Sequence, residues 1–179
     1  MAMRPSNRAR NRWTVELLDL QPGDRLLEIG FGPGLAIAAA LSRQPELKLT
    51  GIDHSAVMLR QASKRNAAAI AAGVVQLHQG SPADLEFPPG SFDKIFSVNV
   101  AQFWTDPVAE FTRLRALLRP GGMLVTTYMP RNRNATDEEA ERKAVTFGNQ
   151  LRKAGFKDIV VNRLPLKPVG AIGVIATHD

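Results

Sequence analysis

Three glycines and two carboxylates in the first third of the chain have the types and the spacing of a ligand-binding site. Residues 26–34 read Leu-Leu-Glu-Ile-Gly-Phe-Gly-Pro-Gly, an apolar run that reaches an acid and then places glycine at alternate positions. Glycine tolerates positive φ and has no Cβ, so a ligand can lie directly against the main chain. The pattern predicts a strand, a binding loop and a helix, with ligand contacts from Glu28, Gly30, Phe31, Gly32 and Gly34.

The spacing of the glycines separates two classes of ligand. Dinucleotide-binding loops favour G-x-G-x-x-G, whereas this loop is G-x-G-x-G and continues with Leu35. A carboxylate at Glu28 would repel a pyrophosphate but can accept hydrogen bonds from an amino group. The loop therefore favours a nucleoside without phosphates over a dinucleotide.

The loop resembles the first motif of the class I S-adenosylmethionine-dependent methyltransferases, and three later segments are similar to that family. Residues 47–53, Leu-Lys-Leu-Thr-Gly-Ile-Asp, end in Asp53, an acid that can bind both ribose hydroxyls but also occurs at this distance in NAD-binding folds. Residues 80–93 resemble the loop beside the adenine. Residues 118–122, Leu-Arg-Pro-Gly-Gly, resemble the turn before the fifth strand. The resemblance implies S-adenosylmethionine as cofactor and S-adenosylhomocysteine as product.

The resemblance also implies further cofactor contacts. His54 and Met58 lie where the family packs side chains against the adenine, and Asn99 lies where it faces the methionine part, with Gln102 as a second polar candidate. In the adenine loop, Ser81 replaces the family's common aspartate and Pro82 has no backbone N–H, so we weigh Asp84 as a substitute.

Four aromatic side chains are candidates for binding the methyl acceptor. Phe103 and Trp104 follow the fourth expected strand and Tyr128 ends the fifth, while Trp13 lies on the N-terminal helix. Each of these positions is also compatible with ordinary core packing. No catalytic base is evident, although His54, Tyr128 and His178 are candidates by residue type. In-line displacement from a sulfonium mainly requires alignment and exclusion of water.

Apolar runs alternate with helical patterns along the whole chain, which predicts a doubly wound α/β fold. We expect a mostly parallel seven-stranded sheet with helices on both faces, and the resemblance implies that the last strand is antiparallel. The expected strands are 25–29, 48–53, 74–78, 93–98, 122–128, 157–163 and 171–177. Helix caps are expected at Ser55 and Asp106, and Thr136 with Glu139 forms a capping-box spacing.

Length and composition set the remaining expectations. The 179 residues predict one domain, 1–179, and the formal net charge is +6. With no cysteine and three scattered histidines, we expect no metal site. Neither a secretory apolar region nor an apolar stretch of about 20 residues is present, so we expect a cytoplasmic protein.

Residues 1–22 combine a basic arm with an apolar helix. Arg4, Arg8, Arg10 and Arg12 precede the first acid of the chain, and Trp13, Leu17, Leu18 and Leu20 form an apolar stripe. Three interpretations stay open: a packed helix with a solvated arm, a lid over cofactor and substrate, or a contact surface for phosphates of RNA or anionic lipid. The first two are favoured because the chain lacks an added RNA-binding module.

The sequence therefore predicts an S-adenosylmethionine-dependent methyltransferase that acts on a small molecule. The alternatives are an RNA or phospholipid-headgroup methyltransferase that uses the basic arm, and a non-catalytic nucleoside-binding module. A nucleic acid or an anionic membrane surface is thus a less favoured partner, and NAD-dependent oxidoreduction is weaker still. The acceptor atom, the number of methyl groups transferred and the oligomeric state are not specified by the sequence.

Overall fold

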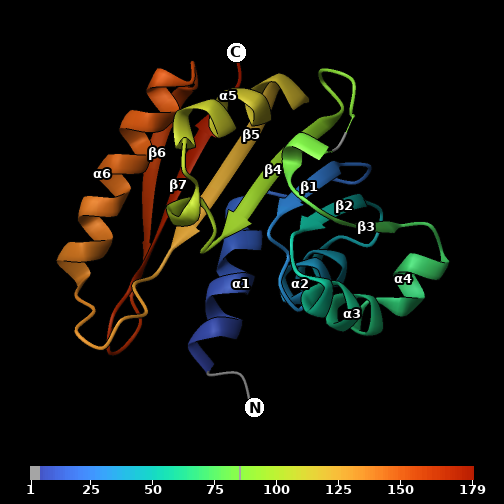
Figure 1. The fold of residues 1–179 in the computed structure, drawn as a ribbon, viewed down its shortest axis with the longest axis horizontal. Coiled ribbons are helices and arrows are strands. Elements are labelled where there is room, and N and C mark those ends of the chain that lie inside the picture. Colours follow the sequence, from blue (N-terminus) through green and yellow to red (C-terminus); the bar gives the residue numbers. More distant parts are fainter. Residues whose placement is uncertain (1–4, 85) are drawn as a thin grey trace.

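A sheet of seven strands forms the centre of the molecule, as seen in the computed structural model, which describes residues 5–84 and 86–179 (Figure 1). The strand order is β3-β2-β1-β4-β5-β7-β6. β1 to β5 pair with one another in parallel, and β7 is antiparallel to both β5 and β6. This confirms the predicted fold class. The strands are β1 (Arg25–Ile29), β2 (Lys48–Asp53), β3 (Val75–Gln79), β4 (Phe92–Val98), β5 (Leu118–Tyr128), β6 (Lys157–Leu164) and β7 (Ala171–Thr177).

Helices cover both faces of the sheet because successive strand residues point to opposite sides. Leu26 and Leu49 pack against α1 (Pro5–Leu17), α2 (Leu35–Arg43) and α3 (Ala56–Arg65). Leu27 and Ile52 belong to the opposite core, which is closed by α5 (Pro107–Leu117) and α6 (Asp137–Lys153). The short α4 (Ala67–Ala71) follows α3 (Figure 1).

The expected helix starts are confirmed by their caps. Ser55 Oγ accepts from the Met58 N–H at 3.3 Å, and Asp106 Oδ1 accepts from the Ala109 N–H at 3.0 Å. Thr136 Oγ1 accepts from the Glu139 N–H at 3.2 Å. The Glu139 carboxylate accepts instead from the Tyr128 hydroxyl and the Asn132 amide, which ties the start of α6 to the end of β5.

β5 begins at Leu118 rather than at residue 122, where the sequence placed its start. Leu118 pairs with Phe92 and Met123 pairs with Lys94, so the residues between Leu118 and Met123 form an irregularity in the ladder. Gly121 has φ +73°, and a Cβ on Gly122 would lie 2.8 Å from the Arg119 carbonyl oxygen. The Arg-Pro-Gly-Gly turn is therefore present, but the strand pairs on both sides of it.

α1 differs from the expected basic arm. The helix begins at Pro5, so Arg8, Arg10 and Arg12 lie within it, while Arg4 lies outside the described residues. Its inner side reaches the sheet, where Thr14 Oγ1 lies 2.9 Å from Thr127 Oγ1 of β5. Arg10 is buried, so a solvated arm is wrong for this residue. In the described part of the chain, no helix is long and apolar enough to cross a membrane.

Candidate functional site

Two adjoining cavities lie at the carboxyl ends of the central strands. The first, which we call the loop cavity, has a volume of about 210 Å³ and is bounded by the glycine loop, by α1 and by Arg131. The second, the side cavity, has about 680 Å³ and extends over Ile29 and Ile52 to the loops after β2, β3 and β4. Gly30, Asn99 and Val100 line both cavities, so the two adjoin each other at these residues.

The three glycines of the loop have different reasons to be glycine. All have positive φ, +70° at Gly30, +52° at Gly32 and +77° at Gly34. A Cβ on Gly30 would collide with Val100, and one on Gly34 would lie 2.6 Å from Asn66 Nδ2. A Cβ on Gly32 would have no heavy atom within 4 Å. Neighbouring side chains therefore leave no room for a Cβ at Gly30 and Gly34, whereas Gly32 faces open space.

Asp53 fastens the glycine loop to the end of β2. Its Oδ2 accepts from the Gly32 N–H at 2.8 Å and its Oδ1 accepts from the Ser55 N–H at 2.9 Å. The side chain is 7% exposed and lines the side cavity. Each carboxylate oxygen has two lone pairs, so Asp53 can hold the loop and still accept hydrogen bonds from a ligand.

Glu28 is a buried acid for which the described residues supply no partner. It is 1% exposed, and its Oε2 has no hydrogen-bond partner among the described residues. Burial, and then the nearby Asp53 charge, raise the pKa of Glu28 to about 8. Its position on β1 places it on the α1 face of the sheet, where it lines the loop cavity. A cation in that cavity would stabilise the ionised carboxylate.

Arg10 is a site residue that the sequence reasoning missed. It lines the loop cavity, is 2% exposed and donates from Nη2 to Asn7 Oδ1 at 2.6 Å. Its Nη1 lies 3.8 Å from Met129 Sδ, and its Nε has no partner among the described residues. Burial, and then the Arg131 charge, lower the pKa of Arg10 to about 10. Helical spacing from the buried Thr14 and Leu18 was the signal that could have placed Arg10 on the inner face.

Asn99 ties the ends of two strands together beside the cavities. It has φ +56°, its Oδ1 accepts from the Met129 N–H at 3.0 Å, and its Nδ2 donates to the Met129 carbonyl at 2.9 Å. Asparagine tolerates this left-handed conformation better than most residues. Asn99 therefore holds the segment after β5 against the site. Gln102, the second polar candidate, lines neither cavity and has a buried Oε1 without a partner among the described residues.

The loop after β3 is closed by its own side chains. The Ser81 N–H and hydroxyl both donate to Asp84 Oδ2, at 2.6 and 2.8 Å, and these bonds lower the pKa of Asp84. Ser81 and Pro82 line the side cavity, whereas Asp84 does not. Asp84 is thus engaged in the turn. His54 lines the same cavity with an exposed side chain, while Met58 of α3 is partly buried and packs against the core on the α2 face of the sheet.

The four aromatic candidates divide into two pairs. Trp104 lines the side cavity and packs edge-on against Phe111 at 5.0 Å, and Phe103 is 79% exposed at the same cavity. Trp13 packs beside Met129 instead. Tyr128 donates its hydroxyl to Glu139 at 2.7 Å. Neither Trp13 nor Tyr128 lines the two cavities.

Of the three candidate bases, His54 lines the side cavity, whereas Tyr128 and His178 do not. Burial, and then Glu139, raise the pKa of Tyr128 to about 12, so its hydroxyl stays protonated at neutral pH. The His178 backbone pairs with Gly122, at the opposite end of β5 from the site. Among the described residues, no group of three or more His, Asp or Glu side chains is arranged to hold a metal ion.

Comparison with known proteins agrees with this geometry. A family model described as "Methyltransferase domain" matches residues 27–126. The uncharacterized methyltransferase YdaC of Bacillus subtilis is 35% identical over 170 residues, which cover 93% of this chain and 90% of that protein. Nocamycin O-methyltransferase of Saccharothrix syringae is 36% identical over 117 residues, 65% of this chain and 41% of that protein.

Among solved structures, an S-adenosylmethionine-dependent methyltransferase from Aquifex aeolicus superposes with a TM-score of 0.76 at 18% identity, covering 99% of this chain and 100% of that one. At this identity the likeness concerns the fold. Together with the family model and the close relative, it shows that the chain belongs to the methyltransferase domain family and is a class I S-adenosylmethionine-dependent methyltransferase.

Proposed function

We propose that this protein binds S-adenosylmethionine in the loop and side cavities and transfers its methyl group to a small-molecule acceptor by in-line displacement. The observation that carries the proposal is the buried side chain of Glu28 next to the three-glycine loop, which has no partner among the residues that the structure describes. A buried carboxylate is costly unless a partner compensates it, and an amino-bearing ligand would be that partner. Membership of the methyltransferase family supports the same conclusion.

The residues present fit the cofactor. Gly32 leaves open space where the chain turns, so a ligand can approach the main chain there. Asp53 lies at the side cavity with acceptor capacity for the ribose hydroxyls. His54, Ser81 and Pro82 line the part of the side cavity that we assign to the adenine. Met58 and Gly34 support the site indirectly, because they pack against residues behind the glycine loop.

S-Adenosylmethionine bound there would supply a methyl group on a sulfonium, an already activated leaving group. The residues of this chain then have to orient the acceptor and exclude water, effects that can lower the barrier by several kcal/mol. Trp104 and Phe103 lie at the side cavity and are the aromatic side chains best placed to contact an acceptor. Tyr128 keeps its proton at neutral pH and His178 lies far from the site. His54 lines the side cavity in the part that we assign to the adenine, so we assign no general base.

A small-molecule acceptor is supported by the relatives. Nocamycin O-methyltransferase and trans-aconitate 2-methyltransferase of Rhodopseudomonas palustris are both named for small-molecule substrates. The described chain holds no inserted helical module after β3, where η1 (Pro82–Asp84) is a single turn. The side cavity of about 680 Å³ is large enough for part of a nucleoside and a small acceptor.

Calorimetric titration with S-adenosylmethionine, S-adenosylhomocysteine and NAD tests the proposal. We expect both adenosyl ligands to bind the wild type, Asp53→Ala to lose most of that affinity, and Glu46→Ala, an exposed carboxylate in the turn before β2, to keep it. A screen of small alcohols, acids and amines for methyl transfer would follow. Binding of NAD without binding of either adenosyl ligand would favour oxidoreduction, and adenosyl binding without transfer to any acceptor would favour a non-catalytic nucleoside-binding module.

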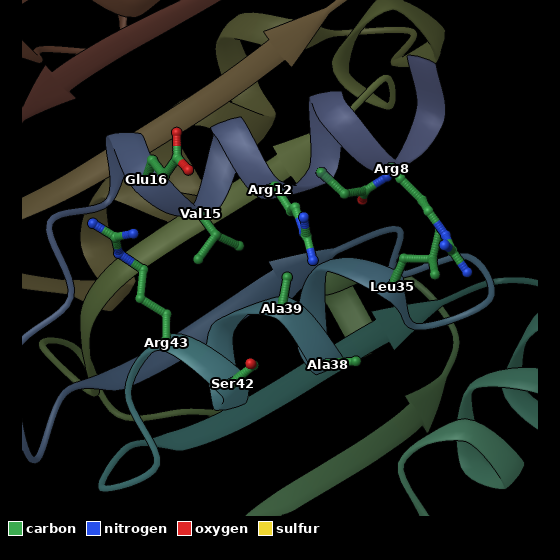
Figure 2. A pocket seen from close by; sticks show the side chains of 10 residues that line it. Arg8, Arg12, Val15, Glu16, Leu35, Ala38, Ala39, Ser42 and Arg43 are labelled. Atoms are coloured by element: carbon green, nitrogen blue, oxygen red, sulfur yellow. The ribbon is translucent and has the colours of Figure 1, made fainter. Parts of the chain in front are cut away.

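A second function is favoured by one observation. A cavity of about 530 Å³ lies between α1 and α2 (Figure 2). Its charged lining residues are three arginines and one acid: Arg8, Arg12, Arg43 and Glu16. In Figure 2 the arginines of α1 extend toward α2, and Arg43 extends back toward α1. Such a groove suits phosphates of an RNA or of lipid headgroups. RNA binding that weakens steeply with salt and with Arg8→Ala plus Arg12→Ala would support this alternative.

A further inference from the structure

The side cavity differs in charge from the two cavities that adjoin α1. The chain has 23 lysines and arginines against 17 aspartates and glutamates, and arginines line both the loop cavity and the cavity between α1 and α2. The side cavity is lined instead by two acids, Asp53 and Glu110, and none of its described lining residues is a lysine or an arginine. Its charge therefore favours a cationic or neutral ligand over an anion.

Glu110 is the acid of this cavity to which the proposed cofactor contacts give no role. Asp53 already accepts from the Gly32 and Ser55 N–H groups, and we assign its remaining capacity to the ribose. Glu110 lies in the first turn of α5, and its buried Oε2 accepts no hydrogen bond from any described residue. This oxygen lies 3.9 Å from Nε of Arg113, an exposed residue that does not line the cavity. Because such a surface pair is weak, Glu110 can exchange it for a ligand.

Two aromatic side chains line the same cavity as Glu110. Trp104 packs edge-on at 5.0 Å against Phe111, the residue that follows Glu110 on α5, so one turn of this helix positions both. Phe103 is 79% exposed, and its ring can cover the apolar part of a ligand. Aromatic rings also attract a cation that lies over their faces. A carboxylate with two aromatic rings matches an ammonium group on an apolar body.

The charge of the cavity also suits the chemistry of methyl transfer to nitrogen. An amine reacts as the free base, after its ammonium form has lost a proton to water. Its lone pair forms the N–C bond as the C–S bond of the sulfonium breaks, so one positive charge passes from sulfur to nitrogen and a neutral thioether remains. A carboxylate near the nitrogen stabilises the charge that develops there. The same carboxylate would repel an alkoxide or a carboxylate nucleophile.

We propose that the methyl acceptor is a small amine with an apolar body, and that Glu110 binds its nitrogen in the side cavity, where Trp104 and Phe103 contact the apolar part. The inference rests on the proposed function, because it names the acceptor class for the same cavity. Glu110 is then the residue that makes the enzyme select amines over alcohols and carboxylic acids of the same shape.

A panel of matched acceptors tests this proposal. For each of four apolar bodies, butyl, cyclohexyl, phenyl and indolyl, the panel contains an amine, an alcohol and a carboxylic acid of equal chain length. Binding is measured by calorimetry on the full chain saturated with S-adenosylhomocysteine, and methyl transfer is measured with S-adenosylmethionine. The variants are Glu110→Gln and the control Glu138→Gln, an exposed acid in the first turn of α6 that does not line the side cavity.

We expect the wild type to bind and methylate amines in preference to the matched alcohols and acids. Glu110→Gln should weaken amine binding by about 10- to 100-fold, the range of a hydrogen bond between charged groups. Its affinity for the alcohols should not change, because they carry no charge for Glu110 to bind. Glu138→Gln should treat all three classes like the wild type.

Two other roles for Glu110 predict different results. If Glu110 stabilised the sulfonium of the cofactor, Glu110→Gln would weaken S-adenosylmethionine more than the neutral S-adenosylhomocysteine. We expect the ratio of these two dissociation constants to stay at the wild-type value. If Glu110 only supported α5 through Arg113, then Arg113→Met would weaken amine binding as much as Glu110→Gln does. We expect Arg113→Met to bind amines at least as tightly as the wild type.

The acceptor assignment and the proposed function can fail separately. A preference for alcohols or acids, or methylation of no amine by a protein that binds S-adenosylmethionine, would overturn the amine assignment and leave cofactor binding intact. Unchanged amine binding in Glu110→Gln would overturn the role of Glu110. A wild type that binds neither S-adenosylmethionine nor S-adenosylhomocysteine would overturn the proposed function as well.

Discussion

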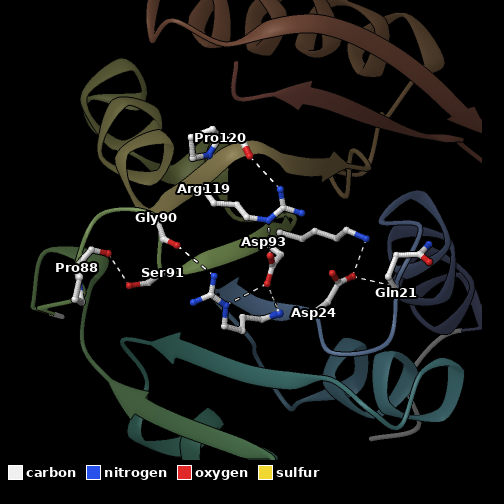
Figure 3. A network of polar contacts seen from close by, with 10 residues as sticks. Gln21, Asp24, Pro88, Gly90, Ser91, Asp93, Arg119 and Pro120 are labelled. Carbon is white, nitrogen blue, oxygen red and sulfur yellow. Dashed lines mark hydrogen bonds and ion pairs between the residues drawn. The ribbon is translucent and has the colours of Figure 1, made fainter.

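The ionisable side chains at the two ends of the central strands differ in whether the protein supplies their partners. At the amino ends, Asp93 accepts from the Arg25 N–H at 2.8 Å and from the Arg119 Nε at 2.5 Å (Figure 3). Beside it, Lys94 Nζ lies 2.7 Å from Asp24 Oδ2, and both of these side chains are buried. At the carboxyl ends, Glu28 and Arg10 are as deeply buried but have no ionic partner in the described chain.

This difference separates charges that serve the fold from charges that serve a ligand. At the amino ends, Figure 3 shows each carboxylate satisfied by donors from neighbouring elements, so those strand starts are joined to one another. At the carboxyl ends, the free energy spent on burying Glu28 and Arg10 is not recovered within the protein. Open α/β sheets bind ligands at this edge. Substitutions at the two ends should therefore have opposite effects on stability and on affinity.

Asp24→Asn should have the largest effect on stability. It leaves Lys94 as a buried, unpaired cation and weakens the bond from the Gln21 N–H. We expect the free energy of unfolding to fall by about 3–5 kcal/mol, measured by urea denaturation, with unchanged affinity of the folded variant for S-adenosylhomocysteine. A loss of binding free energy as large as the loss of unfolding free energy would contradict the view that the charges at the amino ends serve only the fold.

The glycine loop offers a matched pair of substitutions. Gly34→Ala should lower the free energy of unfolding by about 2–4 kcal/mol, because positive φ and the contact with Asn66 both oppose a Cβ. Gly32→Ala meets no neighbouring atom and should cost only about 1–2 kcal/mol through its φ. Gly32 lines the loop cavity, which we assign to the ligand. We compare, for each variant, the loss of binding free energy for S-adenosylhomocysteine in calorimetry with the loss of unfolding free energy. This ratio should be larger for Gly32→Ala than for Gly34→Ala, and the reverse ranking would contradict the assigned site.

The pH dependence of stability tests the state of Glu28. Its pKa in the folded protein, about 8, lies above the ordinary value of 4.5, so the folded state holds this proton more tightly than the unfolded state. Its contribution is fully present below pH 4.5 and is lost as the pH rises toward 8, with a slope of at most about 1.4 kcal/mol per pH unit. Glu28→Gln should flatten the unliganded stability curve in that window. An identical curve for both proteins would show that Glu28 titrates normally.

The smallest effect is expected at Tyr128. Tyr128→Phe removes the hydrogen bond to Glu139 and should lower the free energy of unfolding by about 1 kcal/mol. Because Tyr128 lies outside both cavities, affinity for S-adenosylhomocysteine and methyl transfer should stay at wild-type levels. A stable variant that binds the cofactor but transfers no methyl group would instead support the sequence-based assignment of Tyr128 to the acceptor site.

Local patterns in the sequence were sufficient for most of the fold. The glycine loop, the strand ends at Ile29 and Asp53, and the caps at Ser55 and Thr136 depend on residues close in sequence, and each is confirmed. The start of β5 was missed because its first pair, Leu118 with Phe92, depends on a distant strand.

The site was less predictable because burial and partners are tertiary properties. Only helical spacing from Leu18 indicated that Arg10 is buried, and nothing in the local sequence shows that Trp13 packs away from the cavities. The individual cofactor and acceptor contacts, the single-domain organisation and the cytoplasmic location stay predictions.

Thermal unfolding of wild type and Glu28→Gln at pH 8, each with and without saturating S-adenosylhomocysteine, tests the central claim most directly. The account predicts that Glu28→Gln unfolds at the same or a higher temperature than the wild type without ligand, and that it gains less from the ligand. A variant that is less stable without ligand, yet gains as much from it as the wild type, would show that Glu28 serves the fold like Asp24, and would contradict the account.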